Sequence, residues 1–457
     1  MSGATPAVVI AAPASGSGKT TVATGLMGAL RRAGRTVAPF KVGPDFIDPG
    51  YHALAAARAG RNLDPVLVGE DLIGPLYRHG SDGADIAVVE GVMGLFDGRI
   101  DDNPAGTARG STAHVASLLG APVILVVDAR GQSQSIAALL HGFSTFDHSV
   151  RIAGVILNRV GSARHEDVLR QACEHAGVAV FGAIPRTDEL SVPSRHLGLI
   201  TAVEHDRQAH AAVEAMTTLV ARHVDLAAVA AVAAGQVNAP PWDPAVVAPI
   251  DGNVTVALAA GKAFSFGYTE HGELLRAAGG DVVEFDPLSE PLPSDTAALV
   301  LPGGFPEQFS TELSANDTVR KQINELAARG APIHAECAGL TYLVDELDGY
   351  PMCGVLSGSA RFTDRLTLGY RDAVAVADSA LHMVGERVVG HEFHRTTVTF
   401  DDSYQPAWVF SGRRVERVRD GAVHGGVHAA YLHTHPAAHP DAITRFVTAA
   451  ASSKLAG

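Results

Sequence analysis

A glycine-rich stretch near the N-terminus constrains the fold more than any other feature of this sequence. The residues APASGSGKTT (12–21) overlap the end of the apolar run AVVIAA (7–12), and Val22, Leu26 and Leu30 then recur every four residues. This order predicts a buried strand, a loop and an amphipathic helix. Glycines allow backbone N–H groups to approach phosphate oxygens, and the start of a helix adds a favourable dipole. The stretch therefore predicts a phosphate-binding loop within an α/β domain.

The side chains of this loop are suited to a nucleotide bound with Mg²⁺. Lys19 can reach the terminal phosphates, and the hydroxyl of Thr20 can ligate the metal. The predicted nucleotide-binding residues are Ser15, Gly16, Ser17, Gly18, Lys19, Thr20 and Thr21. Pro13 stands where the pattern G-x-x-x-x-G-K-T begins with glycine. The alternative is a glycine-rich turn that binds no ligand.

Short, almost continuously apolar runs alternate with helical patterns through the first half of the chain. After the first run they cover residues 36–42, 85–91, 122–129, 152–160 and 178–185. Strands that are buried on both faces of a parallel sheet have this character. The pattern predicts a doubly wound α/β domain.

A proline-rich stretch, residues 235–252, interrupts this alternation. It predicts a linker between a first domain of residues 1–234 and a second domain of residues 253–457. A new series of apolar runs then begins, which predicts a second α/β domain. The new runs cover residues 253–260, 281–288, 297–304 and 331–339. The tail after about Phe362 has a more β-rich pattern.

Four acidic residues lie at or just after the ends of the second and third predicted strands of the first domain. They are Asp45, Asp48, Glu90 and Asp97. Ligands of an open α/β sheet bind at the carboxyl ends of the strands, so these acids are expected near the phosphates. Thr20, Asp45 and Glu90 are predicted to hold Mg²⁺, which prefers oxygen ligands. Asp48 and Asp97 are predicted to orient substrate or water, Lys41 is a further candidate, and turn or cap roles are the alternative.

One of the three cysteines lies where a catalytic nucleophile is expected. Cys337, in AECAGLTYL (335–343), follows a predicted strand and precedes a helical pattern. A thiol at such an elbow is expected to be exposed, with its thiolate favoured by the start of the helix. The alternative is a packing role, which is the prediction for Cys173 and Cys353.

Two histidines and two glycines could complete a site around Cys337. A Cys and a His that are distant in sequence but close in space form an activated nucleophile. His433 and His435 lie in YLHTHP (431–436), and as alternate residues of a strand they would share one face, so spacing does not choose between them. Gly303 and Gly304 end another predicted strand, where their N–H groups could stabilise an oxyanion.

The composition excludes several classes of partner. The net charge of −14 argues against nucleic acid or an anionic membrane as the main partner, because both need a basic surface. No apolar stretch approaches the ~18 residues of a membrane span, and the N-terminus has no basic signal region. Three widely spaced cysteines suggest no disulfide framework. The sequence therefore predicts a cytoplasmic protein.

Seven motifs, in order, resemble those of the cobyrinic acid a,c-diamide synthase family across nearly the whole chain. In the first half they are SGSGKTT (15–21), KVGPDFIDP (41–49) and EGVMGLFDG (90–98), which resemble the family's ATP-dependent amide-forming domain, related to dethiobiotin synthetase. LVLPGGFPE (299–307), AECAGLTYL (335–343) and YLHTH (431–435), with GHEFH (390–394) between the last two, resemble its class I glutamine amidotransferase domain. Ala338 stands where the family usually has a second glycine after the cysteine.

The resemblance implies an ATP- and glutamine-dependent amide ligase. Cys337 would attack the side-chain amide of L-glutamine, and the family's YLH segment favours His433 as the residue that moves the proton. ATP with Mg²⁺ would phosphorylate a substrate carboxylate, and ammonia would attack the acyl phosphate. The implied substrate is a corrin poly-carboxylate, cobyrinic acid or the metal-free hydrogenobyrinic acid, amidated at its a and c side chains in cobalamin biosynthesis.

Two other functions are alternatives to this interpretation. One is the amidation of different corrin side chains, as in cobyric acid synthase. The other is a nucleotide-switched ATPase of the partitioning type that carries out no amidation. A homodimer is the assembly considered for this protein.

Overall fold

In the computed structural model the chain is described over residues 4–100, 107–186, 206–250, 254–412 and 417–456. It divides into two units, Met1–Trp242 and Asp243–Gly457. The point of division falls inside the proline-rich stretch 235–252.

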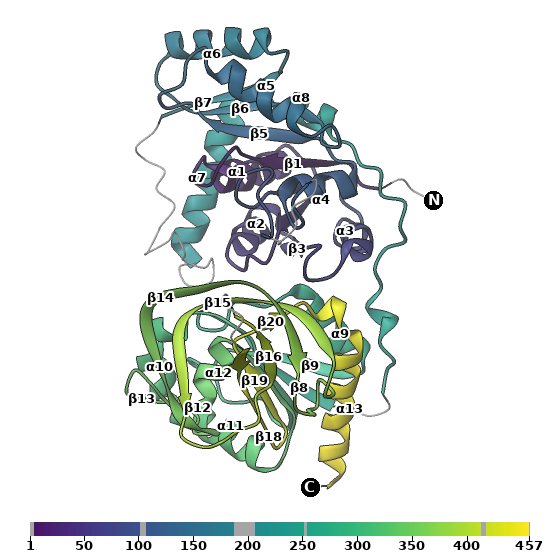
Figure 1. The fold of residues 1–457 in the computed structure, drawn as a ribbon, viewed down its shortest axis with the longest axis vertical. Helices are drawn as coiled ribbons and strands as arrows, with labels where there is room; N and C mark the ends of the chain where they lie inside the picture. Colours follow the sequence, from purple (N-terminus) through teal and green to yellow (C-terminus); the bar gives the residue numbers. More distant parts are fainter. Residues whose placement is uncertain (1–3, 101–106, 187–205, 251–253, 413–416, 457) are drawn as a thin grey trace. The chain divides into compact units, whose positions relative to one another are not determined.

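The first unit is built on a sheet of seven parallel strands (Figure 1), in the order β3-β2-β4-β1-β5-β6-β7. The strands are β1 (Ala7–Ala11), β2 (Val37–Val42), β3 (Arg61–Leu63), β4 (Ile86–Glu90), β5 (Val123–Asp128), β6 (Ile152–Val160) and β7 (Val180–Pro185). All but β3 lie within the apolar runs recognised in the sequence. β3 has three residues, too few to show a periodic pattern, and pairs at the edge beside β2. The predicted doubly wound fold is confirmed.

Helices connect these strands. They are α1 (Lys19–Arg32), α2 (Asp48–Ala56), α3 (Ile73–Gly80), α4 (Thr112–Leu119), α5 (Ile136–Phe146), α6 (Ala163–His175), α7 (Asp206–His223) and α8 (Leu226–Val232). Two glycines let α1 approach α7 closely. A Cβ atom at Gly25 would lie 2.5 Å from the Met216 carbonyl oxygen, and one at Gly28 would lie 2.1 Å from Thr217 Oγ1.

The proline-rich stretch is not a free linker over its described residues. Just before the stretch, Ala234 forms a bridge with Ala7. Within it, the Trp242 N–H donates to the Pro75 carbonyl at 2.9 Å, so the part up to Trp242 belongs to the first unit. Trp242 is 7% exposed. Farther on, the Ile250 N–H donates to the Ala278 carbonyl at 3.0 Å within the second unit.

The second unit contains a six-stranded sheet in the order β18-β19-β11-β10-β8-β9. Its strands are β8 (Val254–Ala259), β9 (Gly280–Phe285), β10 (Thr296–Leu301), β11 (Ile333–Glu336), β18 (Ala422–His424) and β19 (Val427–Ala430). All pairs are parallel except β18 with β19. The helices are α9 (Thr269–Ala277), α10 (Ser310–Ala315), α11 (Asp317–Ala328), α12 (Ala338–Leu343) and α13 (Pro440–Ala456). The second α/β domain is thus also confirmed.

A second, mainly antiparallel sheet accounts for the β-rich tail. Its strands are β12 (Val344–Leu347), β13 (Tyr350–Pro351), β14 (Leu356–Ala375), β15 (Arg387–Phe400), β16 (Trp408–Ser411), β17 (Arg417–Asp420) and β20 (His433–Thr434). Figure 1 shows β14 and β15 as two long, curved neighbouring strands. β15 pairs with β20, which places His391 opposite His433.

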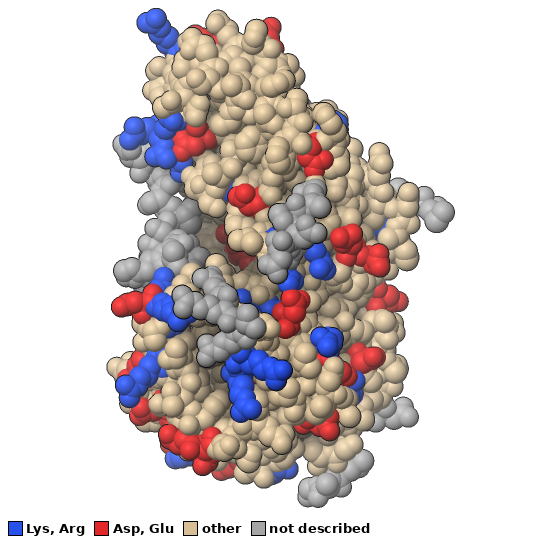
Figure 2. All heavy atoms as spheres, in the orientation of Figure 1, with Lys and Arg blue, Asp and Glu red and all other residues tan. Residues whose placement is uncertain are grey.

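The surface carries both signs of charge. Figure 2 shows Lys and Arg side chains interspersed with Asp and Glu on the face drawn, among a larger area of other residues. Among the described residues, no helix combines the length and apolar character that a membrane crossing requires.

Candidate active sites

The phosphate loop lies at the carboxyl end of β1, as predicted. Gly16 and Gly18 have φ angles of 79° and 97°, a left-handed conformation that glycine adopts without steric cost. Gly18 caps α1, and a Cβ atom on it would lie 2.2 Å from Asn158 Nδ2. Ser15 and Gly16 are exposed, Thr21 is half-buried, and the Ser17 hydroxyl donates to the Ala14 carbonyl at 2.9 Å.

The two loop side chains with predicted roles reach the neighbouring strand ends. Lys19 Nζ donates to the Met93 carbonyl at 2.5 Å, and burial lowers the pKa of this lysine. The Thr20 hydroxyl donates to Glu90 Oε1 at 2.6 Å and lies 3.4 Å from Asp48 Oδ2. Thr20 and Glu90 are therefore brought together, as expected for residues that end β4 and begin α1.

Lys41 lies at the centre of the acidic group. Its Nζ atom is 2.6 Å from Asp48 Oδ2, 3.1 Å from Glu90 Oε1 and 3.9 Å from Asp45 Oδ2. Burial opposes the charge of this lysine, but Asp48 and Glu90 outweigh it and raise the pKa of Lys41. Burial also works against the Glu90 carboxylate, yet Lys41 and His52 lower its pKa to about 2. Asp48 has its pKa raised to about 7 by burial and by the nearby Asp45 carboxylate.

The other two acids act within their own loops. Asp45 Oδ1 accepts hydrogen bonds from the Ile47 and Asp48 N–H groups at 2.8 and 3.0 Å, next to the start of α2. Asp97 Oδ2 accepts from the Gly94 N–H at 2.9 Å. Asp48, rather than Asp45, is thus the carboxylate of this loop for which a contact with Thr20 is found. The hydroxyl and carboxylate oxygens gathered here fit the ligand preference of Mg²⁺.

Three further residues support this site, and the sequence analysis did not single them out. His52 Nε2 lies 2.7 Å from Glu90 Oε2, and both side chains are fully buried. Asn158 Nδ2 donates to the Ser17 carbonyl at 2.9 Å, and Arg159 Nη1 donates to the Gly16 carbonyl at 2.9 Å. The available signal was a polar pair, Asn-Arg, near the end of the otherwise apolar run of β6.

In the second unit, Cys337 occupies the turn between β11 and α12. Its backbone has φ 50° and ψ −98°, a strained conformation for a residue with a side chain. The expectation of an exposed thiol is wrong, because Cys337 is 3% exposed. Burial raises the pKa of the Cys337 thiol, and so does the nearby Glu307. The N–H groups of Gly304 and of Ala338, the first residue of α12, lower the pKa as expected for the start of a helix, but burial outweighs them and keeps the resting thiol protonated. Cys173 and Cys353 are buried, as predicted.

Backbone groups surround the sulfur. The N–H groups of Gly304 and Ala338 donate to it, and the thiol donates to the Phe393 carbonyl at 3.7 Å. Gly304 also has to be glycine for steric reasons, because a Cβ atom there would lie 2.0 Å from the Ala263 carbonyl oxygen. These N–H donors are the kind of groups that stabilise an oxyanion.

His433 packs against Gly303, whereas the contacts found for His435 are with other residues. A Cβ atom on Gly303 would lie 2.3 Å from His433 Cε1, so the absence of a side chain there makes room for the imidazole. His433 Nδ1 lies 3.5 Å from Glu336 Oε2. His435 Nδ1 instead accepts from the Ala437 N–H at 3.3 Å, and its ring lies 4.2 Å from that of Tyr268. Both histidines are fully buried.

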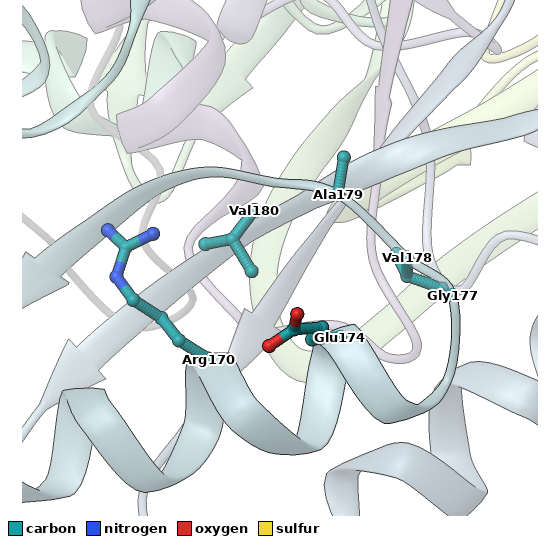
Figure 3. Close-up of a pocket in the computed structure, with 6 residues that line it drawn as sticks. All are labelled: Arg170, Glu174, Gly177, Val178, Ala179 and Val180. Carbon is teal, nitrogen blue, oxygen red and sulfur yellow. The ribbon is translucent and has the colours of Figure 1, made fainter.

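A hollow elsewhere on the first unit is separate from these residues. Figure 3 shows it between α6 and the start of β7, lined by Arg170, Glu174 and residues 177–180. Because it lies at the amino end of β7, it is at the edge of the sheet opposite the phosphate loop.

The two units together define a class of protein. Residues 8–200 match the family model of the CobQ/CobB/MinD/ParA nucleotide binding domain. Residues 255–440 match that of the CobB/CobQ-like glutamine amidotransferase domain. The chain is therefore a nucleotide-binding glutamine amidotransferase in which both domains belong to one polypeptide.

Relatives that match along the whole chain narrow the class to a family. A protein of Mycobacterium bovis named hydrogenobyrinate a,c-diamide synthase is 75% identical over 450 residues, covering 97% of this chain and 98% of that protein. One of the same name from Streptomyces coelicolor is 52% identical, covering 97% of both chains. A cobyrinate a,c-diamide synthase of Gloeobacter violaceus is 40% identical, covering 96% of both. The chain belongs to this family of a,c-diamide synthases, which confirms the resemblance seen in its motifs.

Proposed function

We propose that this chain uses ATP and glutamine to amidate the a and c side-chain carboxylates of hydrogenobyrinic acid in cobalamin biosynthesis. The observation that carries the proposal is the Cys337 sulfur, which lies between the N–H groups of Gly304 and Ala338 in a chain that also has a phosphate loop. The metal-free substrate is favoured over cobyrinic acid because the relatives that are 75% and 52% identical carry its name. We infer that this amidation takes place in the cytoplasm, where ATP and glutamine are available.

Glutamine hydrolysis is assigned to the second unit. The Cys337 sulfur attacks the side-chain amide carbon while His433 takes the thiol proton, a transfer that a protonated resting thiol requires. The negative charge that develops on the amide oxygen is stabilised by backbone N–H groups, for which Gly304 and Ala338 beside the sulfur are the candidates. His433 returns the proton to the leaving nitrogen as ammonia departs. Water then hydrolyses the thioester to glutamate.

Amide formation is assigned to the first unit. A corrin carboxylate attacks the γ-phosphorus of ATP, and ADP leaves with the bridging oxygen. Ammonia then attacks the acyl phosphate carbon, inorganic phosphate leaves, and the amide loses a proton. Lys19 and the loop N–H groups hold the phosphates in position. Thr20, Glu90, Asp45 and Asp48 would hold Mg²⁺, which neutralises phosphate charge when bound.

The test of this function follows product mass and uses two corrinoids. The unmodified chain, with ATP, Mg²⁺ and glutamine, is expected to convert hydrogenobyrinic acid to its a,c-diamide faster than cobyrinic acid. Amides at other side chains would instead support activity of the cobyric acid synthase type. ATP hydrolysis with no corrin product would support the partition-type switch.

A variant of the proposed nucleophile tests whether glutamine hydrolysis and amide formation take place at separate sites. We expect Cys337→Ser to lower glutamine-dependent amidation by more than about 10³-fold, because the residues of the site act as a unit. Amidation supported by ammonium salts should persist, since the acyl phosphate still forms. Loss of both activities in a folded variant would contradict the assignment of two sites.

A further inference from the structure

The proposed base, His433, needs a partner that fixes its orientation. An imidazole that takes a proton at one nitrogen works best when its other N–H is held by an acceptor, which sets the tautomer and stabilises the imidazolium. The sequence predicted a cysteine and histidines for this site but singled out no acid for this role. The contact found for His435 Nδ1 is with the Ala437 N–H rather than with His433.

Glu336 lies in the right place. It is the last residue of β11, directly before the proposed nucleophile, and its Oε2 atom is 3.5 Å from His433 Nδ1. Its Oε1 atom accepts from the Thr434 N–H at 3.0 Å and from the Thr434 hydroxyl at 3.2 Å. His334 Nε2 lies 3.4 Å from the same oxygen. The side chain therefore spans from the strand before the nucleophile to the strand of the base.

The surroundings of Glu336 keep it ionised. Its side chain is 11% exposed, and burial alone would raise the pKa of the carboxyl. Hydrogen bonding and charge interactions with His334 and His433 outweigh burial and hold the pKa well below its usual range. An ionised, nearly buried carboxylate beside an imidazole stabilises the protonated ring in an environment where charge is weakly screened.

We propose that Glu336 is a positioning residue that completes a Cys337–His433–Glu336 relay for glutamine hydrolysis. It accepts the Nδ1–H of His433, so Nε2 is the nitrogen that receives the thiol proton. The inference rests on the proposed glutaminase activity and adds a residue to it. The same strand turn thus contributes two consecutive residues to the reaction, one on each side of the imidazole.

The test measures glutamine hydrolysis by Glu336→Gln in the full chain. We expect kcat to fall by about 10²–10⁴-fold, as when a carboxylate that orients a catalytic histidine becomes an amide. The KM for glutamine should change by less than about threefold, because Glu336 is not expected to touch the substrate. Ammonia-dependent amidation should be unchanged. The acidic limb of the pH dependence of kcat/KM should move to lower pH by about one unit, because the imidazolium loses its counter-ion.

Asp420 provides a matched control. It is also a buried carboxylate that holds the chain near His433, accepting from the Tyr431 and Leu432 N–H groups at 3.0 and 3.1 Å. Asp420→Asn should keep kcat within about threefold and leave the acidic limb in place. A Glu336→Gln variant that behaves in the same way would reduce Glu336 to a structural clamp.

A second comparison uses the histidine itself. If Glu336 acts through His433, then Glu336→Gln should cause almost no further loss in a His433→Ala background. A loss of the same size in both backgrounds would overturn the proposal, as would a kcat for Glu336→Gln within about threefold of the unmodified chain. Absence of glutamine hydrolysis by the unmodified chain would remove the proposed function itself, and the role of Glu336 with it.

Discussion

At Cys337, backbone strain and burial occur in one residue. A φ of 50° in a residue with a side chain costs of order 1–3 kcal/mol and persists because β11 and α12 hold the turn on both sides. The turn directs the sulfur towards the Gly304 N–H. Because the thiol is buried and protonated, its reactivity depends on proton transfer at the moment of attack rather than on a standing thiolate.

The two histidines of β20 and its neighbouring turn should respond differently to truncation. We expect His433→Ala to lower kcat for glutamine hydrolysis by about 10²–10⁴-fold, the usual cost of losing a general base. His435→Ala should keep kcat within about threefold but lose about 1 kcal/mol of stability, because it removes the acceptor for the Ala437 N–H. Steady-state glutaminase kinetics and thermal unfolding measure the two effects. A glutaminase defect confined to His435→Ala would reverse the assignment.

The sequence could not make this choice between histidines. Alternate residues of an extended strand face the same side, but β20 ends at Thr434 and the chain turns into a 3-10 helix at Pro436. Glu336 was overlooked for a related reason. A residue next to a nucleophile was interpreted as part of the strand. Only the pairing of β11 with β19, which sets Glu336 beside Ala430, brings His433 within its reach.

At the scale of elements, the carboxyl ends of β1, β2 and β4 bring together the residues of the proposed metal and phosphate site. We expect Glu90→Gln to raise the Mg²⁺ concentration needed for half-maximal amidation by more than about tenfold, since even indirect changes at metal sites have that effect. Asp45→Asn should have a smaller effect, because an amide oxygen can still accept from the Ile47 and Asp48 N–H groups. Mg²⁺ titrations of ATP-dependent amidation measure both.

Glutamine hydrolysis serves as the control for these variants. It should be retained in both Glu90→Gln and Asp45→Asn, because the affected residues belong to the first unit. An unchanged Mg²⁺ requirement in both variants would show that these acids have structural roles only. Glu90 would then be the partner of His52 and Lys41, and Asp45 the acceptor of the N–H groups beside α2.

The parallel sheets were largely predictable, whereas the antiparallel one was not. Strands such as β5 and β6 are nearly continuous apolar runs because both faces are buried, and that pattern is strong in a sequence. β14 has 20 residues that mix buried, half-buried and exposed positions without regular alternation, and its register with β15 shifts between Phe362 and Thr367. Such a strand has no clear period, so its extent emerges only from tertiary pairing.

At the scale of the whole molecule, acid should destabilise the second unit first. Burial lowers the pKa of His391 to about 3 and that of His382 to about 4. Each stays neutral in the fold and protonates near pH ~6.5 when unfolded, so its contribution is present above that pH and is lost as the pH falls. The loss between pH ~6.5 and ~5 is about 2 kcal/mol for each group. Asp420, with its pKa raised to about 6, offsets about 1 kcal/mol at pH ~5.

Hydrogen exchange resolved by peptide checks this expectation. Within the described part of the first unit, His52 is the one fully buried histidine, and it faces Glu90. Peptides of the second unit should therefore lose protection first between pH 7 and pH 5, after correction for intrinsic exchange rates. His391→Asn, which cannot take up a proton in this range, should reduce that loss. Equal loss of protection in the two units would contradict the assignment.

The position of Trp242 determines where the chain of this enzyme can be divided into two halves. Two contacts hold residues 234–242 to the first unit: the bridge between Ala234 and Ala7, and the hydrogen bond from the Trp242 N–H to the Pro75 carbonyl. The Trp242 indole also lies 5.0 Å from the ring of His79. A truncated chain that ends at residue 234, where the alternation of strands and helices ends, would lack this segment and leave the apolar surface beneath it exposed. A gene split into two halves should therefore be cut after Trp242, and recombination between relatives should keep the segment with the nucleotide-binding half that it covers.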